Sequence, residues 1–361
     1  MNQPAILPIR VLIVDDSAFM RAALSRMIAT DAALRVVGAA ASGTEALQTI
    51  PTLDPDVITL DVEMPGLGGL ETLRRIMAEF PRPVIMVSST TVKGVAITFN
   101  ALAAGAFDYV PKQLADTSLD IRHIRDPLIA RIKAAGESRH ASDPLRLQRK
   151  PPRSELSRRK AFPSLATIVA MGVSTGGPKA LQEILPLFPG DLTVPILVVQ
   201  HTSAGFTAPF VERLNKLCAV EVCEASHGKA VRPGVVYFAP PGTHMTVNRP
   251  TDSRIAICLA EKPEHQVHVP SADVLMQSVA FSFGSQAMGV IMTGMGSDGA
   301  QGMSAIHREG GFTVGQDEAS CAVYGMPKVC AEMRILDKVV PLARIPHEIL
   351  EATRYRKTSA S

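Results

Sequence analysis

Two parts of this sequence are built from short, continuous runs of apolar and β-branched residues that alternate with segments of helical spacing. Unbroken apolar strands are buried on both faces, which is typical of a parallel sheet covered by helices. Five such runs in residues 1–133 predict a doubly wound, flavodoxin-like α/β domain. They are VLIVDD (11–16), RVVGAA (35–40), DVITLD (56–61), PVIMVSS (83–89) and AFDYV (106–110).

The second part shows the same pattern, and a different kind of segment separates it from the first. Residues 134–163 contain many Pro, Ser and Arg residues and lack apolar periodicity, which is typical of a linker. We therefore predict two α/β domains with doubly wound parallel sheets, at 1–133 and 164–361, joined by a linker at 134–163. The strand-like runs of the second domain are ATIVAMGV (166–173), VPILVVQH (194–201), VVYFAP (235–240) and AMGVIMTGM (287–295).

The positive charge of the chain is confined to the predicted linker. The 361 residues have a formal net charge of +3, whereas the segment 134–163 alone carries eight basic and three acidic residues. A solvated spacer explains this excess better than a nucleic-acid contact, because no aromatic residues for base stacking are interleaved with the arginines. The second domain is slightly acidic and has no helix-turn-helix pattern, so we expect no nucleic-acid partner.

The sequence has no pattern typical of export or of membrane insertion. Its first residues lack a basic region followed by an apolar stretch and a small-residue cleavage site, and no apolar run approaches the ~18 residues that span a bilayer. The five cysteines form no C-x-x-C pair, and their odd number favours reduced thiols over a disulfide framework. We expect a cytoplasmic monomer that does not insert into a membrane.

Charged and hydroxyl side chains follow four strands of the first domain. Asp15 and Asp16 end the first strand, Asp61 the third and Ser88 the fourth, and Lys112 follows the fifth. Because the carboxyl ends of parallel strands meet at one edge, we expect these groups to converge. Three carboxylates repel one another unless a cation lies among them, and their oxygens suit Mg²⁺. Helix capping explains Asp16 alone, whereas the whole set predicts an aspartyl-phosphate site with Asp61 as nucleophile.

These residues resemble the response-regulator receiver family. The resemblance rests on V-D-D-S (14–17), D-V-E-M-P-G (61–66), M-V-S-S (86–89) and D-Y-V-P-K (108–112). It implies phosphorylation of Asp61, and it implies switch residues that couple this event to a surface change, at Ser88, Tyr109 and Lys112. It also implies Mg²⁺ bound at Asp15, Asp16, Asp61 and the carbonyl of Glu63. Gln113 and Gly68 depart from the usual pattern without touching the acceptor chemistry.

The second domain offers a serine, a histidine and an aspartate at the ends of three strands. Ser174 opens a glycine-rich turn, His201 ends the next strand, and Asp298 lies in a later glycine-rich turn. A serine nucleophile needs a base, and the base needs a carboxylate that orients it. Helix N–H groups beside such a serine can stabilise an oxyanion. Ser174 alone is explained as a helix cap, so the prediction of a serine hydrolase rests on the three residues together.

Several motifs of the second domain resemble the catalytic domain of the protein-glutamate methylesterases of bacterial chemotaxis. They are GVSTGGP, VVQHTSAGFTAPFVERLN, APPGTHM, HVPSADVL, TGMGSDGAQGM and QDEASCAVYGMP. The resemblance implies a Rossmann-like serine hydrolase domain behind the receiver. It also implies the roles of four residues: Ser174 as nucleophile, His201 as general base, Asp298 as orienting carboxylate and the N–H of Met295 as oxyanion donor. Thr202, Ser203 and Ser297 depart from the family pattern beside these positions.

The same resemblance implies a substrate and a form of regulation. Glutamate γ-methyl esters on the signalling helices of chemoreceptors are hydrolysed, and specific glutamines are deamidated, without a cofactor. The chemotaxis histidine kinase is the phosphodonor. The unphosphorylated receiver obstructs the catalytic face, and phosphorylation raises the activity for sensory adaptation.

Other interpretations are weaker. His265 and His268 are three residues apart but have no clear third ligand, so a loop or substrate groove is favoured over a metal site. Cys321 has no identifiable activating partner, which favours a buried small thiol over a nucleophile. The competing hypothesis is a non-enzymatic response regulator whose second domain binds a partner. The presence of all three catalytic residue types favours the enzyme.

Overall fold

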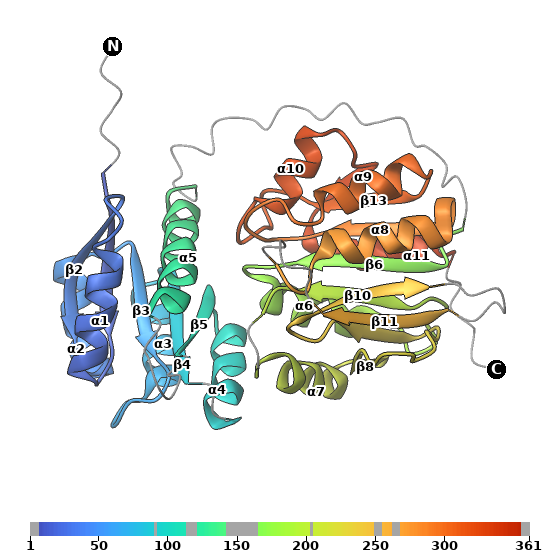
Figure 1. Ribbon diagram of the computed structural model, residues 1–361. Helices are drawn as coiled ribbons and strands as arrows, with labels where there is room; N and C mark the ends of the chain where they lie inside the picture. Colours follow the sequence, from blue (N-terminus) through green and yellow to red (C-terminus); the bar gives the residue numbers. More distant parts are fainter. Residues whose placement is uncertain are drawn as a thin grey trace, which may run out of the picture. The chain divides into compact units, whose positions relative to one another are not determined.

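The computed structural model describes residues 7–89, 92–112, 121–141, 165–202, 205–248, 255–261 and 268–354, and it divides the chain into two compact units, Met1–Lys150 and Pro151–Ser361 (Figure 1). We call them the receiver unit and the catalytic unit. Both contain a parallel sheet between helices, which confirms the predicted α/β class.

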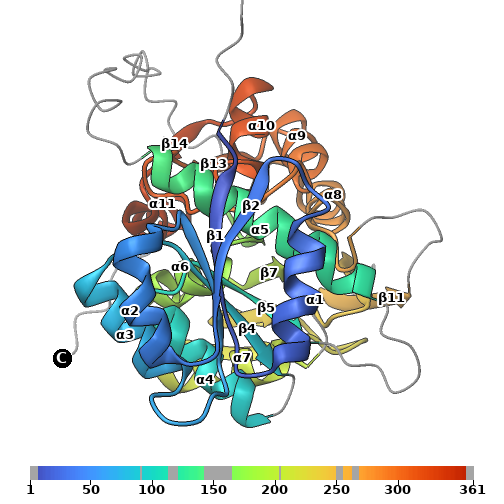
Figure 2. The same ribbon diagram turned by 90° about the vertical axis from the view of Figure 1, so that its left-hand side faces the viewer.

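The receiver unit has a five-stranded parallel sheet in the order β2-β1-β3-β4-β5. The helices α1 and α5 contact each other on one face, and α2, α3 and α4 cover the other (Figure 2). The strands are β1 (Ile9–Val14), β2 (Leu34–Ala40), β3 (Val57–Asp61), β4 (Val84–Ser89) and β5 (Asp108–Lys112). The helices are α1 (Ala18–Ile28), α2 (Gly43–Leu53), α3 (Gly69–Glu79), α4 (Val92–Ala103) and α5 (Ile121–Ala141).

The receiver unit extends further along the chain than we predicted. Helix α5 ends at Ala141, so residues 134–141 are helical and do not belong to a linker. Ala135 is fully buried in the core with Ile132, and Gly136 lies so close to Ile9 that an added Cβ would be 2.7 Å from its Cδ1. Small residues hide this contact in the sequence, because Ala and Gly give almost no apolar periodicity. The remainder of the predicted linker lies outside the described residues.

The catalytic unit has a seven-stranded parallel sheet in the order β14-β13-β12-β6-β7-β9-β8. From the central strand β6 the chain adds strands first on one side and later on the other, so β6 adjoins the point where the strand order reverses. The strands are β6 (Ile168–Val173), β7 (Ile196–Gln200), β8 (Glu221–Glu224), β9 (Val235–Phe238), β12 (Ala287–Ile291), β13 (Phe312–Gln316) and β14 (Lys338–Val340).

Helices and one hairpin cover this sheet. On one face α8 packs against α9 and against β10, whose antiparallel pairing with β11 we did not predict. Apolar side chains of these elements, among them Met245, Leu275 and Met303, form one buried cluster. The elements are α6 (Gly177–Ile184), η1 (Leu185–Leu187), α7 (Thr207–Leu217), β10 (Thr243–Asn248), β11 (Ala256–Glu261), α8 (Ala272–Phe283), η2 (Gly284–Gln286), α9 (Ala300–Arg308), α10 (Met326–Glu332), η3 (Leu342–Arg344) and α11 (Ile345–Ala352).

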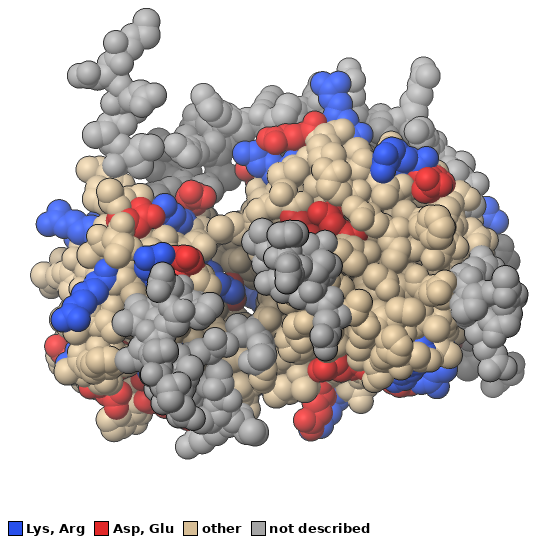
Figure 3. Space-filling model, in the orientation of Figure 1, with Lys and Arg blue, Asp and Glu red and all other residues tan. Residues whose placement is uncertain are grey.

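Charged side chains of both signs lie interspersed on the visible face of the described residues (Figure 3). Among the described helices, none combines the length and the apolar character that crossing a membrane requires.

The turn between β6 and α6 depends on a close approach of Gly176 to the side chain of Ala322. Gly176 has a φ of +76°, and an added Cβ would lie 2.4 Å from Cβ of Ala322. Gly228 has nearly the same φ, +75°, but no atom lies within 4 Å of an added Cβ.

Alanine substitutions at these two glycines distinguish the cost of a positive φ, which both share, from the cost of a steric overlap, which only Gly176 has. We expect Gly176→Ala to lower the free energy of unfolding of the catalytic unit by about 2 kcal/mol more than Gly228→Ala, because only the first creates an overlap. Denaturant unfolding of both variants measures the difference. Equal losses would mean that the Ala322 contact does not constrain the turn.

Candidate active site and phosphoryl-acceptor site

Ser174 is the first residue after β6, and its backbone is tied to both neighbouring strands. Its N–H donates to the carbonyl of Thr293 (3.0 Å), which follows β12, and its carbonyl accepts from Nε2 of Gln200 (3.0 Å), the last residue of β7. The N–H of Gly177 donates to the same carbonyl (2.8 Å) and closes the turn into α6. The serine is therefore held at the carboxyl edge of three adjacent strands, β12, β6 and β7.

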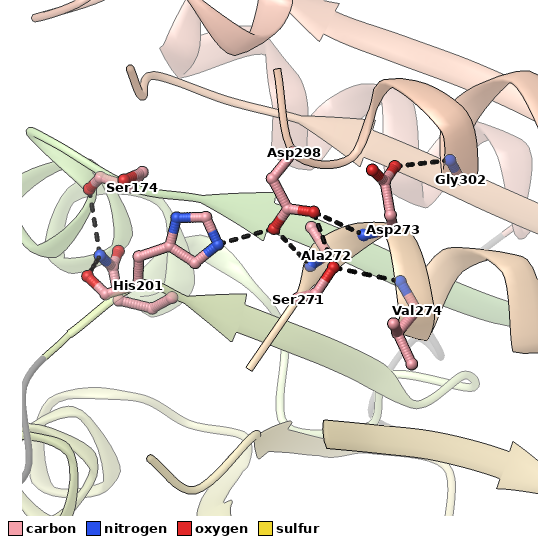
Figure 4. A network of polar contacts seen from close by, with 9 residues as sticks. Ser174, His201, Ser271, Ala272, Asp273, Val274, Asp298 and Gly302 are labelled. Atoms are coloured by element: carbon pink, nitrogen blue, oxygen red, sulfur yellow. Dashed lines mark hydrogen bonds and ion pairs between the residues drawn. The ribbon is translucent and has the colours of Figure 1, made fainter. Parts of the chain in front are cut away.

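His201 and Asp298 form a hydrogen-bonded pair at the same edge. His201 Nε2 lies 2.7 Å from Oδ2 of Asp298, and the side chains are 13% and 7% exposed. The backbone N–H of His201 donates to the carbonyl of Val173, directly before the serine (3.1 Å). Figure 4 shows the His201 ring between Ser174 and Asp298. Within the described residues no hydrogen bond joins Ser174 Oγ to His201, and such bonds commonly tighten only when substrate binds.

The carboxylate of Asp298 sits at the N-terminus of α8, where several donors converge on it (Figure 4). Besides His201, it accepts hydrogen bonds from Ser271 Oγ (2.7 Å) and from the N–H groups of Ala272 (2.7 Å) and Asp273 (3.1 Å). Burial alone would raise the pKa of Asp298, but the hydrogen bonds from His201, Ser271 and Ala272 outweigh it and lower the pKa well below the usual aspartate range. Asp298 is thus an anion that can orient an imidazole and stabilise its protonated form.

The loop that contains Met295 packs directly against the serine. Gly294 lies so close that an added Cβ would be 2.7 Å from Cβ of Ser174. Its N–H donates to Val323, and its carbonyl accepts from Gly325 and Met326, so the loop is held on both sides. In the hydrogen bonding of the described residues, the N–H of Met295 has no partner. A backbone N–H without a partner is what an oxyanion donor requires, and the role of Met295 stays a prediction.

Sequence reasoning missed three features of this site. It did not predict Ser271 as a donor to Asp298, although a serine before the run ADVLM is an N-cap signal. It did not assign Gln200 and Thr293, which hold the serine backbone. It also did not predict that the ring of His268 stacks on that of His201, with centroids 4.5 Å apart and planes 13° apart.

The remaining candidates of the catalytic unit are Cys321, His265 and the three positions that depart from the family pattern. Burial raises the pKa of Cys321 to about 12, with Asp317 and Glu318 adding to the effect, so the thiol stays protonated. His265 and Ser203 lie outside the described residues. Ser297 is exposed beside Asp298, and Thr202 follows His201 directly.

In the receiver unit, Lys112 bridges two buried carboxylates. Its Nζ lies 2.8 Å from Oδ2 of Asp15 and 2.8 Å from Oδ2 of Asp61. Burial raises the pKa of Asp61, an effect that Lys112 opposes. Burial alone would lower the pKa of Lys112, but the two carboxylates raise it, so the lysine is a cation. One ammonium group balances only part of the charge at this edge.

The exposed Asp16 completes an oxygen-rich cluster. Asp15, Asp16 and Asp61 each offer a carboxylate oxygen, and the three oxygens lie within 4.8 Å of one another. Glu63 donates its N–H to Oδ1 of Asp61 (3.2 Å). Hard oxygen donors with excess negative charge are the set that Mg²⁺ prefers, so these residues fit the predicted cation.

The predicted switch residues lie on the two strands beyond Asp61. Ser88 is buried at the end of β4, where its hydroxyl donates to the carbonyl of Gly94 (3.2 Å) and accepts from Oγ1 of Thr98 on α4 (2.7 Å). Tyr109 is buried in β5, and Lys112 ends that strand. The hydroxyl of Ser88 is thus linked to α4, an element that can carry a change from the site to the surface.

Two family models match the chain, one in each unit. The CheB methylesterase family matches residues 169–349, and the response regulator receiver domain matches residues 11–122. The protein-glutamate methylesterase/protein-glutamine glutaminase 2 of Nitratidesulfovibrio vulgaris is 43% identical over 354 residues, which cover 92% of this chain and 96% of the relative. The chain belongs to the CheB methylesterase family.

Other members of this family are similar over the same span. The protein-glutamate methylesterase/protein-glutamine glutaminase of Halalkalibacterium halodurans is 43% identical over 342 residues, covering 95% of this chain and 97% of the relative. The crystal structure of the Thermotoga maritima CheB methylesterase catalytic domain is 34% identical with a TM-score of 0.50, and it covers 52% of this chain and 99% of that one. The similarity therefore includes both units.

The donors to Asp298 can be tested singly. Ser271→Ala removes one hydrogen bond to Oδ1 and the side-chain cap of α8, so we expect a loss of about 1 kcal/mol in the free energy of unfolding. We also expect slower ester hydrolysis, because the carboxylate is less firmly held. Thermal unfolding and methanol release measure the two effects.

Ser42→Ala is the matched control, because Ser42 caps α2 of the receiver unit in the same way. Its cost in stability should be similar, but basal hydrolysis should not change. Hydrolysis that falls equally in both variants would contradict a specific role of Ser271.

Proposed function

We propose that this chain is a phosphorylation-activated serine hydrolase that removes methyl groups from glutamate γ-esters and deamidates specific glutamines of chemoreceptor signalling helices. The observation that carries the proposal is the hydrogen-bonded pair of His201 and Asp298 beside Ser174, at three adjacent strand ends. The names of the relatives support the same reaction class.

Ser174 is the nucleophile in this mechanism. Its Oγ attacks the γ-carbonyl carbon of the ester, and its proton passes to His201. Because Nε2 of His201 bonds to Asp298, the other ring nitrogen, Nδ1, is the one that receives this proton. Asp298 stabilises the imidazolium that forms, and the N–H of Met295 donates to the oxyanion.

The second half of the reaction returns the enzyme to its starting state. The tetrahedral intermediate collapses, the bond to the methoxy group breaks, and methanol leaves with the proton from His201. A water molecule then gives a proton to His201 and attacks the acyl carbon. The bond from this carbon to Oγ breaks, Oγ takes the proton back from His201, and the glutamate carboxylate is released. A glutamine side chain presents the same acyl group, with ammonia as the leaving group.

The receiver unit regulates this reaction in the proposal. The carboxylate of Asp61 attacks the phosphorus atom of a phosphohistidine on the chemotaxis kinase, and the phosphorus–nitrogen bond breaks. Asp15, Asp16, Asp61 and the carbonyl of Glu63 would hold Mg²⁺, which when bound neutralises charge on the phosphoryl oxygens. Lys112 contributes a second positive charge, and Ser88 and Tyr109 couple the new phosphoryl group to α4 and β5.

The role of the nucleophile has a direct test. Ser174→Ala should abolish methanol release from methylated receptor, because no other group takes the place of Oγ. A methanol assay with purified receptor measures the effect. Ser226→Ala, at an exposed serine of the same unit, should keep the full rate. Hydrolysis that persists in Ser174→Ala would remove Ser174 from this role.

The role of the acceptor is tested by Asp61→Asn. We expect basal hydrolysis to persist and activation by acetyl phosphate with Mg²⁺ to disappear, because the amide cannot form the acyl phosphate. Asp126→Asn, at an exposed carboxylate of α5, is the control and should still be activated. Activation of Asp61→Asn would show that another residue accepts the phosphoryl group.

A further inference from the structure

We propose that His268 is a positioning residue, whose ring holds the imidazole of His201 in the orientation that bonds to Asp298 and faces Ser174. This inference rests on the proposed serine hydrolase function, and it adds a fourth side chain to the three that the family resemblance implies.

The geometry of the two rings is the first argument. Their centroids are 4.5 Å apart and their planes are inclined by 13°, so the rings are stacked. Stacked aromatic rings attract each other, and contact between two flat faces limits rotation about χ2. Rotation of His201 would break both this stack and the 2.7 Å hydrogen bond to Asp298. The ring is thus fixed through one of its faces as well as through its edge.

The position of His268 in the chain is the second argument. It lies three residues before Ser271, which caps α8 and donates to Oδ1 of Asp298. The N–H groups of Ala272 and Asp273 also donate to that carboxylate. The short segment 268–273 therefore contacts both partners of the His201–Asp298 pair, so their distance is set by one piece of backbone.

The charge of His268 suits this role. Partial burial lowers its pKa, the nearby His201 lowers it further, and only Asp298 opposes these effects. A neutral ring can stack on His201 both before and after His201 takes the proton of Ser174. A second cation at this position would repel the imidazolium.

A role in substrate binding is the alternative, because His268 is only partly covered and part of its surface is open to solvent. The two roles predict different rates of reaction between Ser174 and a small serine-directed reagent that does not contain the receptor. A positioning residue affects the activation of Ser174 whatever the acyl group, whereas a residue that binds the receptor affects only KM for the receptor.

Three variants separate these roles. His268→Ala removes the ring, His268→Leu fills similar space without a flat face, and His268→Phe keeps a flat face without a titratable group. The control is His347→Ala, at an exposed histidine of α11. The measurements are the rate of covalent labelling of Ser174 by a fluorophosphonate, kcat and KM for methanol release, and the unfolding midpoint of each full-length variant.

We expect His268→Ala and His268→Leu to lower both the labelling rate and kcat by about ten- to a hundredfold, with little change in KM, because a misoriented base loses activation. His268→Phe should keep both rates within about threefold of the unchanged chain, and His347→Ala should not alter them. If His268→Ala does not fold, the difference in labelling rate between His268→Leu and His268→Phe still tests whether a flat ring is needed.

Normal labelling of all variants, a change confined to KM, or equal loss in the Leu and Phe variants would overturn the proposal. The unchanged chain separates this result from failure of the proposed function. If fluorophosphonate does not label its Ser174, the serine hydrolase assignment fails first. If Ser174 of the unchanged chain is labelled and the His268 variants are labelled at the same rate, the serine hydrolase assignment stands and only the proposed role of His268 is wrong.

Discussion

The buried negative charge of Asp298 is the constraint on which the rest of the catalytic site depends. A carboxylate that is 7% exposed remains ionised only because hydrogen-bond donors replace water. Three donors come from the N-terminus of α8 and one from His201. The packing of α8 against β6 and α9 therefore determines where the charge lies, and the charge determines how the histidine is turned. Helix α8 therefore has a direct role in the site, because donors at its N-terminus hold the catalytic carboxylate.

The two units solve the problem of buried charge at the edge of a parallel sheet in different ways. In the catalytic unit, neutral N–H and O–H donors and one imidazole stabilise a single carboxylate. In the receiver unit, two buried carboxylates share the ammonium group of Lys112, and the exposed Asp16 adds a third negative charge. In the first arrangement the carboxylate of Asp298 stays ionised while His201 gains and loses a proton. The second has excess negative charge and therefore suits a divalent cation and a phosphoryl group.

Much of this could be predicted from residue types and strand ends. Continuous apolar runs predicted both sheets, and Ser174 and His201 were expected at neighbouring strand ends, where they lie. The predictions were wrong or incomplete where contacts are made by small or polar residues. Ala135 and Gly136 extend the receiver core through α5, and Ser271 reaches Asp298 across 27 positions of sequence. The hairpin of β10 and β11 was missed because it packs on α8 outside the parallel sheet.

The sequence by itself determined the α/β class, the glycine turn that presents Ser174, and the acidic and basic groups at the receiver edge, because periodicity and turn chemistry are local properties. Only the tertiary structure decided that Nε2 of His201 bonds to Asp298, that α8 supplies that carboxylate with donors, and that His268 stacks on His201. These contacts join residues up to 97 positions apart at distances of a few ångströms. A local sequence pattern does not predict such contacts, because they result from how the helices pack on the sheet.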